Sequence, residues 1–226
     1  MSERDALGLS GYVDGIDVSQ VQTITDPAAV YAAGFRFAFV KASEGLSYRD
    51  PRARSHLDAL SGAGLLVGAY GFARVSQGQP RAQARLLYDA ATSDGRHMVR
   101  LVLDLESCPT GTPWSALRDF AEEYMSELRL SGSLPVLYTM GSWVPHLSGL
   151  DVPVWVAQYR SVTQAWAPSQ AEADAFFGAR PDVALFQYSG DRGYRVPGIP
   201  QDCDRNLWHG DEAGLREWFG LAPTSG

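Results

Sequence analysis

The sequence is poor in the residues that build metal centres and disulfide frameworks. Among its 226 residues are only two cysteines, Cys108 and Cys203, and they form no Cys-x-x-Cys pair. Free thiols are the default state of such cysteines in a cytosolic protein. The four histidines are scattered, without a His-x-x-x-His or carboxylate-bridged spacing. We therefore expect no metal site, and we assign no cofactor.

Long apolar runs are also absent. Residues 1–5 (MSERD) are polar and mixed in charge, and no apolar h-region follows them, so no Sec-type signal peptide is visible. No apolar run is long enough to span a bilayer. We expect a protein made in the cytoplasm without a signal peptide and without membrane insertion, whose export would need outside help.

The charge pattern and the absence of several motifs argue against further classes of function. A net charge of −7 and a pI near 5.0 argue against a nucleic-acid partner. No Gly-x-Gly-x-x-Gly loop follows the first predicted strand at 15–19, so a dinucleotide site is unsupported. Phosphate-cradling loops and a Gly-x-Ser-x-Gly elbow are missing as well. We expect a monomer that uses neither phosphate transfer nor a serine nucleophile.

What the chain does contain is an alternation of short apolar runs and helix-like segments along almost its whole length. Helices are predicted at 26–33, 50–64, 79–91 and 113–130, and eight strands at 15–19, 36–42, 65–72, 99–106, 134–139, 152–159, 183–188 and 201–206. This alternation indicates an α/β protein with a parallel sheet, and eight units suit a closed TIM-like barrel. At this length some helices must be short or missing, particularly between Thr139 and Val183. An open doubly wound sheet is the alternative.

The fourth strand carries the most informative pattern. Its apolar run ends in Asp104-Leu105-Glu106, and side chains in a strand alternate faces, so the two carboxyls point the same way. Two close carboxylates cannot both ionise readily, and one tends to keep its proton near neutral pH. A proton donor beside an anionic partner is what glycosidic bond cleavage requires. The alternative is that both acids merely mark where a strand meets solvent.

Polar and aromatic side chains recur at the other strand ends, where the site of such a barrel forms. Aromatic rings stack on the apolar faces of sugars, while carboxylates and amides bind hydroxyl and acetamido groups, so the set favours a carbohydrate substrate. Phe37, Phe39 and Trp218 are better explained as core residues, and Lys41 fits a structural ion pair as well as a site role. The candidates at these ends are Asp17, Lys41, Tyr70, Phe72, Asp104, Glu106, Tyr138, Trp155, Gln158, Tyr159, Gln187, Tyr188, Asp204 and Asn206.

With these residues assembled, the chain resembles glycoside hydrolase family 25, the Chalaropsis-type lysozymes (N-acetylmuramidases), from about Gly15 to Gly210. Any one motif is weak, but the ordered set is highly specific. In order, the motifs are GIDVS at 15–19, KASEG at 41–45, GAYGF at 68–72, DLE at 104–106, YT at 138–139, WVAQY at 155–159, QY at 187–188 and CDRN at 203–206. Two departures matter. The family usually has His where this chain has Gly71, and a small aliphatic residue where it has Cys203, which puts substrate fit in question more than activity.

The resemblance implies an irregular, somewhat flattened barrel, with residues 1–220 as a single catalytic domain and 221–226 as a tail or the start of a linker. It implies hydrolysis, with retention, of the β-1,4 bond between N-acetylmuramic acid and N-acetylglucosamine in peptidoglycan. By motif, Glu106 would be the general acid and Asp104 would stabilise the reacting sugar through its 2-acetamido group. Asp17 and Asp204 would complete an acidic floor, and the remaining candidates would bind substrate. The attacking group, a protein carboxylate or the substrate's acetamido, stays open.

Two other functions remain as alternatives: a non-catalytic wall-binding module, and a related glycosidase acting on chitin or another polymer. The missing signal peptide fits a phage endolysin that acts on the wall after release, and the catalytic domain of a bacterial enzyme would look the same.

Overall fold

The computed structural model describes residues 5–93, 95, 98, 100–160, 166–190 and 195–222. Within these residues eight strands close into a barrel, because β1 pairs with both β2 and β11. In order around the barrel they are β1 (Tyr12–Val18), β2 (Phe37–Glu44), β4 (Leu66–Phe72), β5 (Arg100–Asp104), β6 (Leu134–Met140), β7 (Val154–Ala157), β8 (Val183–Ser189) and β11 (Asp204–His209). A short strand, β3 (Tyr48–Arg49), pairs with the end of β2. The closed barrel is confirmed, and the open sheet is wrong.

The prediction of an all-parallel sheet is wrong for the last strand. β11 runs antiparallel to both of its neighbours, β1 and β8. After β8 the chain returns through a hairpin of β9 (Arg195–Val196) and β10 (Ile199–Asp202) instead of a crossover helix, so β11 enters the barrel from the end at which β8 leaves it. Consequently it is the first residues of β11, not its last, that lie at the functional end.

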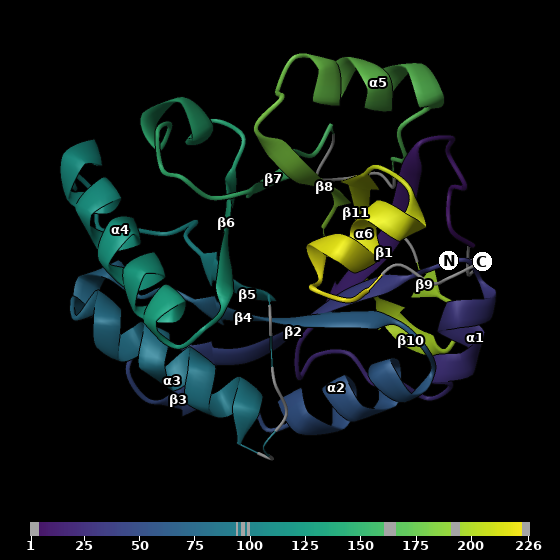
Figure 1. Cartoon of the computed structure of the whole chain (residues 1–226), viewed down its shortest axis with the longest axis horizontal. Coiled ribbons are helices and arrows are strands. Elements are labelled where there is room, and N and C mark those ends of the chain that lie inside the picture. The colour runs from purple at the N-terminus through teal and green to yellow at the C-terminus, as the bar shows by residue number, and fades with distance from the viewer. Residues whose placement is uncertain are drawn as a thin grey trace.

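The helices confirm that some connections are short. α1 (Pro27–Ala32), α2 (Ala53–Gly62), α3 (Pro80–Thr92) and α4 (Trp114–Leu130) follow the strands as expected, and Figure 1 shows them one after another around the barrel. Asp26 caps α1, accepting a hydrogen bond from the Ala29 N–H. Only a 3-10 turn, η2 (Val144–His146), joins β6 to β7, whereas η1 (Val75–Gln77) precedes α3. The helix α5 (Gln170–Gly178), whose capping box joins Ser169 and Glu172, was not predicted from the sequence.

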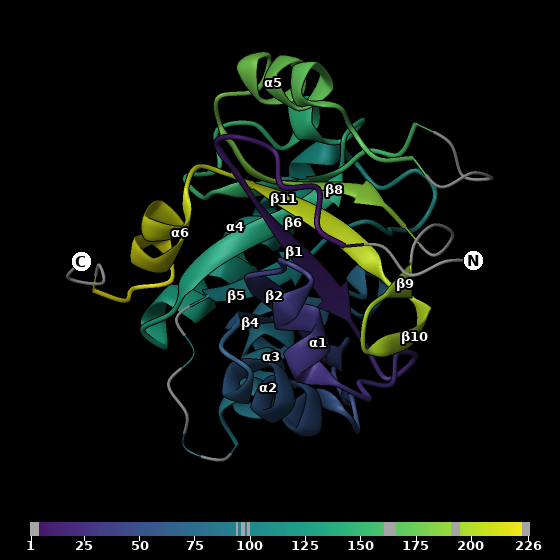
Figure 2. The same ribbon diagram turned by 90° about the vertical axis from the view of Figure 1, so that its right-hand side faces the viewer.

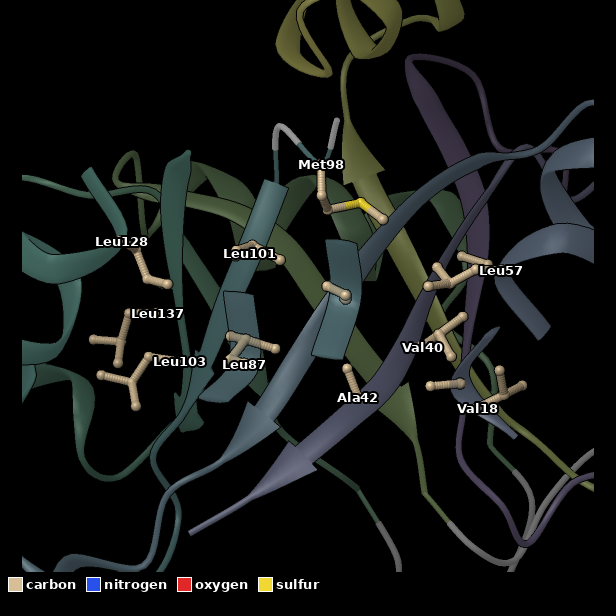
Figure 3. Packing of buried hydrophobic residues seen from close by; sticks show 14 of the residues in the cluster. Val18, Val40, Ala42, Leu57, Leu87, Met98, Leu101, Leu103, Leu128 and Leu137 are labelled. Carbon is tan, nitrogen blue, oxygen red and sulfur yellow. The ribbon is translucent and has the colours of Figure 1, made fainter. Parts of the chain in front are cut away.

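Alternation along the strands divides the core into layers. Outward-facing aliphatic side chains such as Val40, Leu101 and Leu103 pack under α2, α3 and α4 (Figure 3). Inward-facing side chains, including Phe37 and Phe39 as predicted, fill the barrel itself. A third cluster lies between α5 and the outer faces of β7, β8 and β11.

The helix α6 (Glu212–Trp218) closes one end of the barrel. Leu215 and Phe219 are buried in the inner cluster, and Trp218 packs against it, as expected for a core residue. The Arg100 guanidinium lies 3.9 Å from the Trp218 ring centroid, and its Nε donates to the Trp218 carbonyl (2.6 Å). Figure 2 shows α6 at one end of the barrel and the β9–β10 hairpin at the other. The end that α6 leaves open is the end where the functional side chains gather.

Candidate active site

A cavity of about 220 Å³ opens at the carboxyl ends of the parallel strands. All of its lining residues were predicted as site residues from the sequence. They are Asp17, Lys41, Tyr70, Phe72, Asp104, Glu106, Tyr138, Trp155, Gln187 and Asp204. We refer to this cavity as the catalytic pocket.

The end of β5 places the two central carboxyls. Leu103 and Leu105 are buried in the outer core, so alternation turns Asp104 and Glu106 toward the inside of the barrel. Pairing continues past the last strand residue, because the Leu105 N–H donates to the Tyr138 carbonyl (3.0 Å). The Leu105 carbonyl in turn accepts from the Thr139 hydroxyl (2.8 Å). The segment that carries Glu106 is therefore fixed by the neighbouring strand.

The surroundings of the Asp104 carboxyl disfavour its ionised form. Its side chain is buried, and burial raises its pKa well above the usual range of an aspartic acid. The negative charges of Glu106 and Asp17 raise this pKa further, whereas Lys41 lowers it. The negative charge of Glu106 beside Asp104 therefore makes it unfavourable for both carboxyls to ionise at once. The prediction that one of the two acids keeps a proton thus has a physical basis in the site.

The Asp17 carboxylate is the end point of a hydrogen-bond network. Its Oδ2 accepts from Gln187 Nε2 (2.8 Å) and Asn206 Nδ2 (2.9 Å). Since an indole N–H can only donate, the bond from Trp155 Nε1 to Asn206 Oδ1 (2.8 Å) fixes which way the amide points. Gln187 Oε1 accepts from the Tyr138 hydroxyl (2.7 Å). These hydrogen bonds therefore lead, directly or through a side-chain amide, to the Asp17 carboxyl and fix its position.

Asp204 reaches the same site from the antiparallel strand. It is the first residue of β11 and pairs with Asp17 across the β1–β11 ladder. The hydroxyl of Tyr70 faces this acidic group. Burial, and then the charges of Asp17, Asp104 and Asp204, raise the Tyr70 pKa well above its usual value. Tyr70 therefore stays a neutral hydrogen-bond donor among acids.

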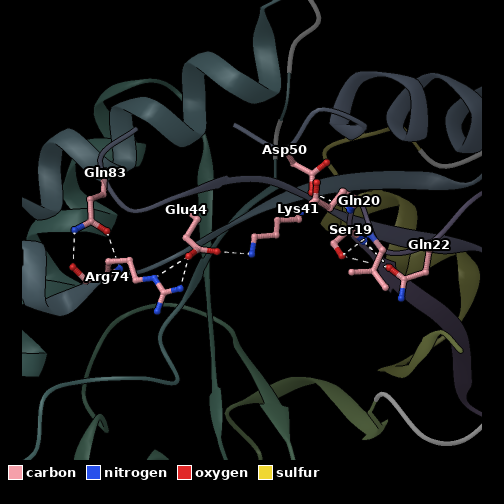
Figure 4. Close-up of polar contacts among 9 residues, drawn as sticks. Ser19, Gln20, Gln22, Lys41, Glu44, Asp50, Arg74 and Gln83 are labelled. Atoms are coloured by element: carbon pink, nitrogen blue, oxygen red, sulfur yellow. Dashed lines mark hydrogen bonds and ion pairs between the residues drawn. The ribbon is translucent and has the colours of Figure 1, made fainter. Parts of the chain in front are cut away.

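Lys41 both lies in the pocket and forms an ion pair. It lines the catalytic pocket, and its Nζ donates to the Glu44 carboxylate (2.7 Å). On its other side, Glu44 accepts from Arg74 Nε (2.7 Å), as Figure 4 shows. Burial raises the Glu44 pKa, but the hydrogen bonds from the two cations outweigh burial and lower it. Arg74 was not predicted from the sequence, because its contact with Glu44 joins the loop after β4 to the end of β2, 30 residues away in the chain.

The match to known proteins decides the family. The model of glycosyl hydrolases family 25 matches residues 16–199. The chain belongs to this family. Lysozyme M1 of Streptomyces globisporus is 31% identical over 219 residues, which cover 90% of this chain and 70% of that protein. The N,O-diacetylmuramidase of Chalaropsis sp is 25% identical over 217 residues, covering 89% of both chains. The bacterial lysozyme structure from Streptomyces coelicolor superposes with a TM-score of 0.72 at 28% identity, covering 95% of this chain and 98% of that chain.

As a member of family 25, the chain is a glycoside hydrolase, and four of its predicted site residues lie outside the catalytic pocket. Asn206 and Tyr159 lie behind the pocket wall, where Asn206 bonds Asp17 and the Tyr159 hydroxyl donates to Gln187. Gln158 is exposed and accepts from Arg180 Nη2 (3.0 Å). Tyr188 is buried in the cluster under α5, on the outer face of the barrel. The structure therefore does not bring Gln158 and Tyr188 to the pocket.

Trp155 contributes to this family 25 site differently from the expected sugar platform. Its side chain is only 2% exposed and packs against Phe39 (4.9 Å between ring centroids) and Tyr138 (4.8 Å). It lines the pocket, and its indole N–H donates a hydrogen bond to Asn206. Tyr70 and Phe72, which are half-buried, are the more accessible aromatic side chains of the pocket.

Neither departure from the family pattern changes the wall of the pocket. A Cβ on Gly71 would lie 2.7 Å from the Tyr124 hydroxyl and 2.9 Å from Ser43 Oγ, so this position faces the helix layer. Cys203 is buried in the outer core, and burial raises the pKa of its thiol well above the usual value. Both cysteines are free. Within the described ranges, no group of three or more His, Cys, Asp or Glu could hold a metal ion, and no helix is long and apolar enough to cross a membrane.

Proposed function

We propose that this hydrolase is an N-acetylmuramidase that cleaves, with retention, the β-1,4 bond between N-acetylmuramic acid and N-acetylglucosamine. The printed names of its relatives, lysozyme and N,O-diacetylmuramidase, support a peptidoglycan substrate. The observation that carries the proposal is the pair at the end of β5. There a buried Asp104 and a half-exposed Glu106 line one pocket, and burial together with the charge of Glu106 raises the Asp104 pKa.

In the proposed reaction Glu106 is the general acid. It donates its proton to the oxygen of the leaving N-acetylglucosamine as the glycosidic bond breaks, and becomes a carboxylate. Asp104, as an anion, stabilises the positive charge that develops at the anomeric carbon through the 2-acetamido group. Its burial makes this electrostatic stabilisation stronger than it would be in water. Asp17 and Asp204 form the acidic floor, and Lys41, Tyr70, Phe72, Tyr138 and Gln187 bind the sugar.

Retention follows whether a protein carboxylate or the substrate's own acetamido oxygen attacks the anomeric carbon. In both routes water completes the reaction after Glu106, now a base, removes its proton. Trapping a covalent glycosyl-enzyme would identify the first route. An oxazoline intermediate would identify the second.

The test is digestion of purified peptidoglycan, with the new reducing sugar identified by mass spectrometry. We expect a muramic acid reducing end for the wild type and a loss of at least about a hundredfold in rate for Glu106→Gln. Glu123→Gln, on the exposed face of α4, is the matched control and should keep wild-type activity. A glucosamine reducing end would contradict muramidase action. A wild type that binds walls without turnover would indicate a binding module, and cleavage of chitin alone would indicate the third alternative.

We also propose that the protein acts as a monomeric single domain on the cell wall after its release from the cytoplasm. The large exposed hydrophobic side chains among the described residues are scattered over several elements, which supports the monomer: Val21, Tyr31, Trp114, Leu130, Leu134 and Leu221. Barrel closure joins β1 to β11, which supports one catalytic domain over residues 1–220. Light scattering would test the monomer, and the activity of a chain ending at residue 220 would test the domain limits.

A further inference from the structure

A second cavity, of about 180 Å³, lies beside the catalytic pocket. It is lined by residues 73–76, after β4, and residues 107–109, after β5; we refer to it as the rim pocket. The two cavities are neighbours in the chain, because Phe72 and Glu106 line the catalytic pocket and the next residues line the rim pocket. The Ala73 N–H donates to the Asp104 carbonyl (2.8 Å), which joins the two segments. The Arg74 guanidinium carbon lies 4.7 Å from the ring centroid of Phe72, so Arg74 borders both cavities.

The loop that forms the rim pocket is held in shape by buried hydrogen bonds. Gln83, only 1% exposed, accepts from the Arg74 N–H (3.0 Å) and donates to the carbonyls of Arg74 (3.0 Å) and Gly78 (2.7 Å). Gln77 accepts from the Leu46 N–H (2.9 Å), which ties the loop to the end of β2. Figure 4 shows Gln83 and Glu44 on either side of Arg74. The rim pocket thus needs no ligand to form.

The rim pocket combines an apolar floor with a cation. Its floor includes Ala73, which is buried, and Cys108, which packs against the outer core. Arg74 lies at its edge with 46% of its side chain exposed. Glu44 occupies Nε and Nη2 of Arg74, and the described residues give Nη1 no acceptor. Lys41 and Arg74 carry two positive charges, and Glu44, which pairs with both, neutralises one of them. One positive charge therefore remains beside the catalytic pocket, which contains four carboxyls.

We propose that the rim pocket binds the 3-O-lactyl group of muramic acid, with Arg74 as the partner of its carboxylate or, in strands with stem peptides, of its amide carbonyl. This inference rests on the proposed function. The lactyl ether is the only group that distinguishes the two sugars of peptidoglycan, and it consists of a methyl group and an acyl group. C3, which bears it, is next to C2, whose acetamido group is assigned to Asp104. The methyl fits the apolar floor, and the acyl oxygens fit the free donors of Arg74.

The test pairs a change in the enzyme with a change in the substrate. Soluble glycan strands freed of stem peptides carry lactyl carboxylates, and methyl esterification of the same strands removes this charge while keeping the carbonyl. For the wild type we expect esterification to raise KM about tenfold, the effect of losing one charge-assisted hydrogen bond. Arg74→Gln should raise KM by a similar factor on the charged strands, and esterification should then change KM by less than about twofold.

Arg81→Gln is the matched control, because Arg81 is also a glutamate-paired arginine, with 44% of its side chain exposed, on the outer side of α3. It should respond to esterification as the wild type does. A second variant, Ser76→Trp, narrows the mouth of the rim pocket from an exposed position and should raise KM most on strands with intact stem peptides.

The results separate this inference from the proposed function. If the wild type does not hydrolyse the strands at all, the proposed function fails. If the wild type hydrolyses charged and esterified strands with equal KM, the rim pocket does not bind the lactyl carboxylate, and the inference is overturned. If Arg74→Gln lowers kcat equally on both, Arg74 acts only by positioning Glu44 and Lys41, and the inference is likewise overturned.

Discussion

Asn206 is the residue whose replacement tests the network beneath the catalytic pocket. It is fully buried, donates to Asp17 Oδ2 (2.9 Å) and accepts from Trp155 Nε1 (2.8 Å). Asn206→Leu substitutes an apolar side chain of similar size and removes both bonds. A hydrogen bond to a charged group contributes about 1.5–3 kcal/mol, and a buried donor left without an acceptor costs about 1–3 kcal/mol. Because bonds within one network are not additive, we expect the free energy of unfolding to fall by about 3–5 kcal/mol.

The assay is urea denaturation followed by tryptophan fluorescence, and a second substitution isolates the orphaned indole. Trp155→Phe removes the N–H donor. In the Asn206→Leu background this substitution lowers the free energy of unfolding only through lost packing contacts. In the wild type it also breaks the hydrogen bond to Asn206. The two substitutions should therefore couple by about 1–2 kcal/mol. Strictly additive effects would refute the Trp155–Asn206 hydrogen bond, and a loss below about 1 kcal/mol for Asn206→Leu alone would refute the stabilising role of both bonds that Asn206 makes.

Three further predictions concern the acid, the helix layer and the thiols. The pKa of Asp104 is raised in the folded state, so above the unfolded value near 4 the unfolded chain loses this proton more readily than the folded protein, and stability falls as the pH rises. Asp104→Asn should therefore increase the free energy of unfolding at pH 7 but not at pH 3, as measured by denaturation at both pH values. Gly71→His should lower the free energy of unfolding by about 2 kcal/mol, since its Cβ would lie 2.7 Å from the Tyr124 hydroxyl, and Tyr124→Ala should relieve this clash. Titration with a thiol reagent should modify Cys108 in the native protein and Cys203 only after denaturation, because Cys203 is buried and its pKa is raised.

The sequence predicted the barrel and its functional end because both depend on local patterns. Apolar runs of strand length bounded by turn residues identified the strands, and the chemistry at their ends identified the pocket. The direction of the last strand was not predictable in this way. The hairpin β9–β10, which reverses the chain before β11, is short, and its buried residues Val196 and Ile199 pack against distant parts of the outer core, so no local pattern encodes it.

Two kinds of site residue could not be assigned correctly from the sequence alone. Gln187 and Tyr188 are adjacent in β8, so alternation allows only one of them to face the barrel interior, and a strict period of two would have excluded Tyr188. Arg74 and Gln83 could not be found, because they act through partners on other elements. Arg74 bonds Glu44 at the end of β2, and Gln83 supports the rim loop from within α3.

The central claim is that Glu106 donates the proton to the leaving group, and the dependence of the Glu106→Gln defect on that group tests it most directly. A natural sugar leaves poorly without a proton, whereas an aryl leaving group with a low pKa departs unaided. We predict that Glu106→Gln loses at least about a hundredfold in kcat/KM on glycan strands, but less than about tenfold on an aryl glycoside that the wild type cleaves. An equal loss on both substrates would contradict the assignment of Glu106 as the general acid.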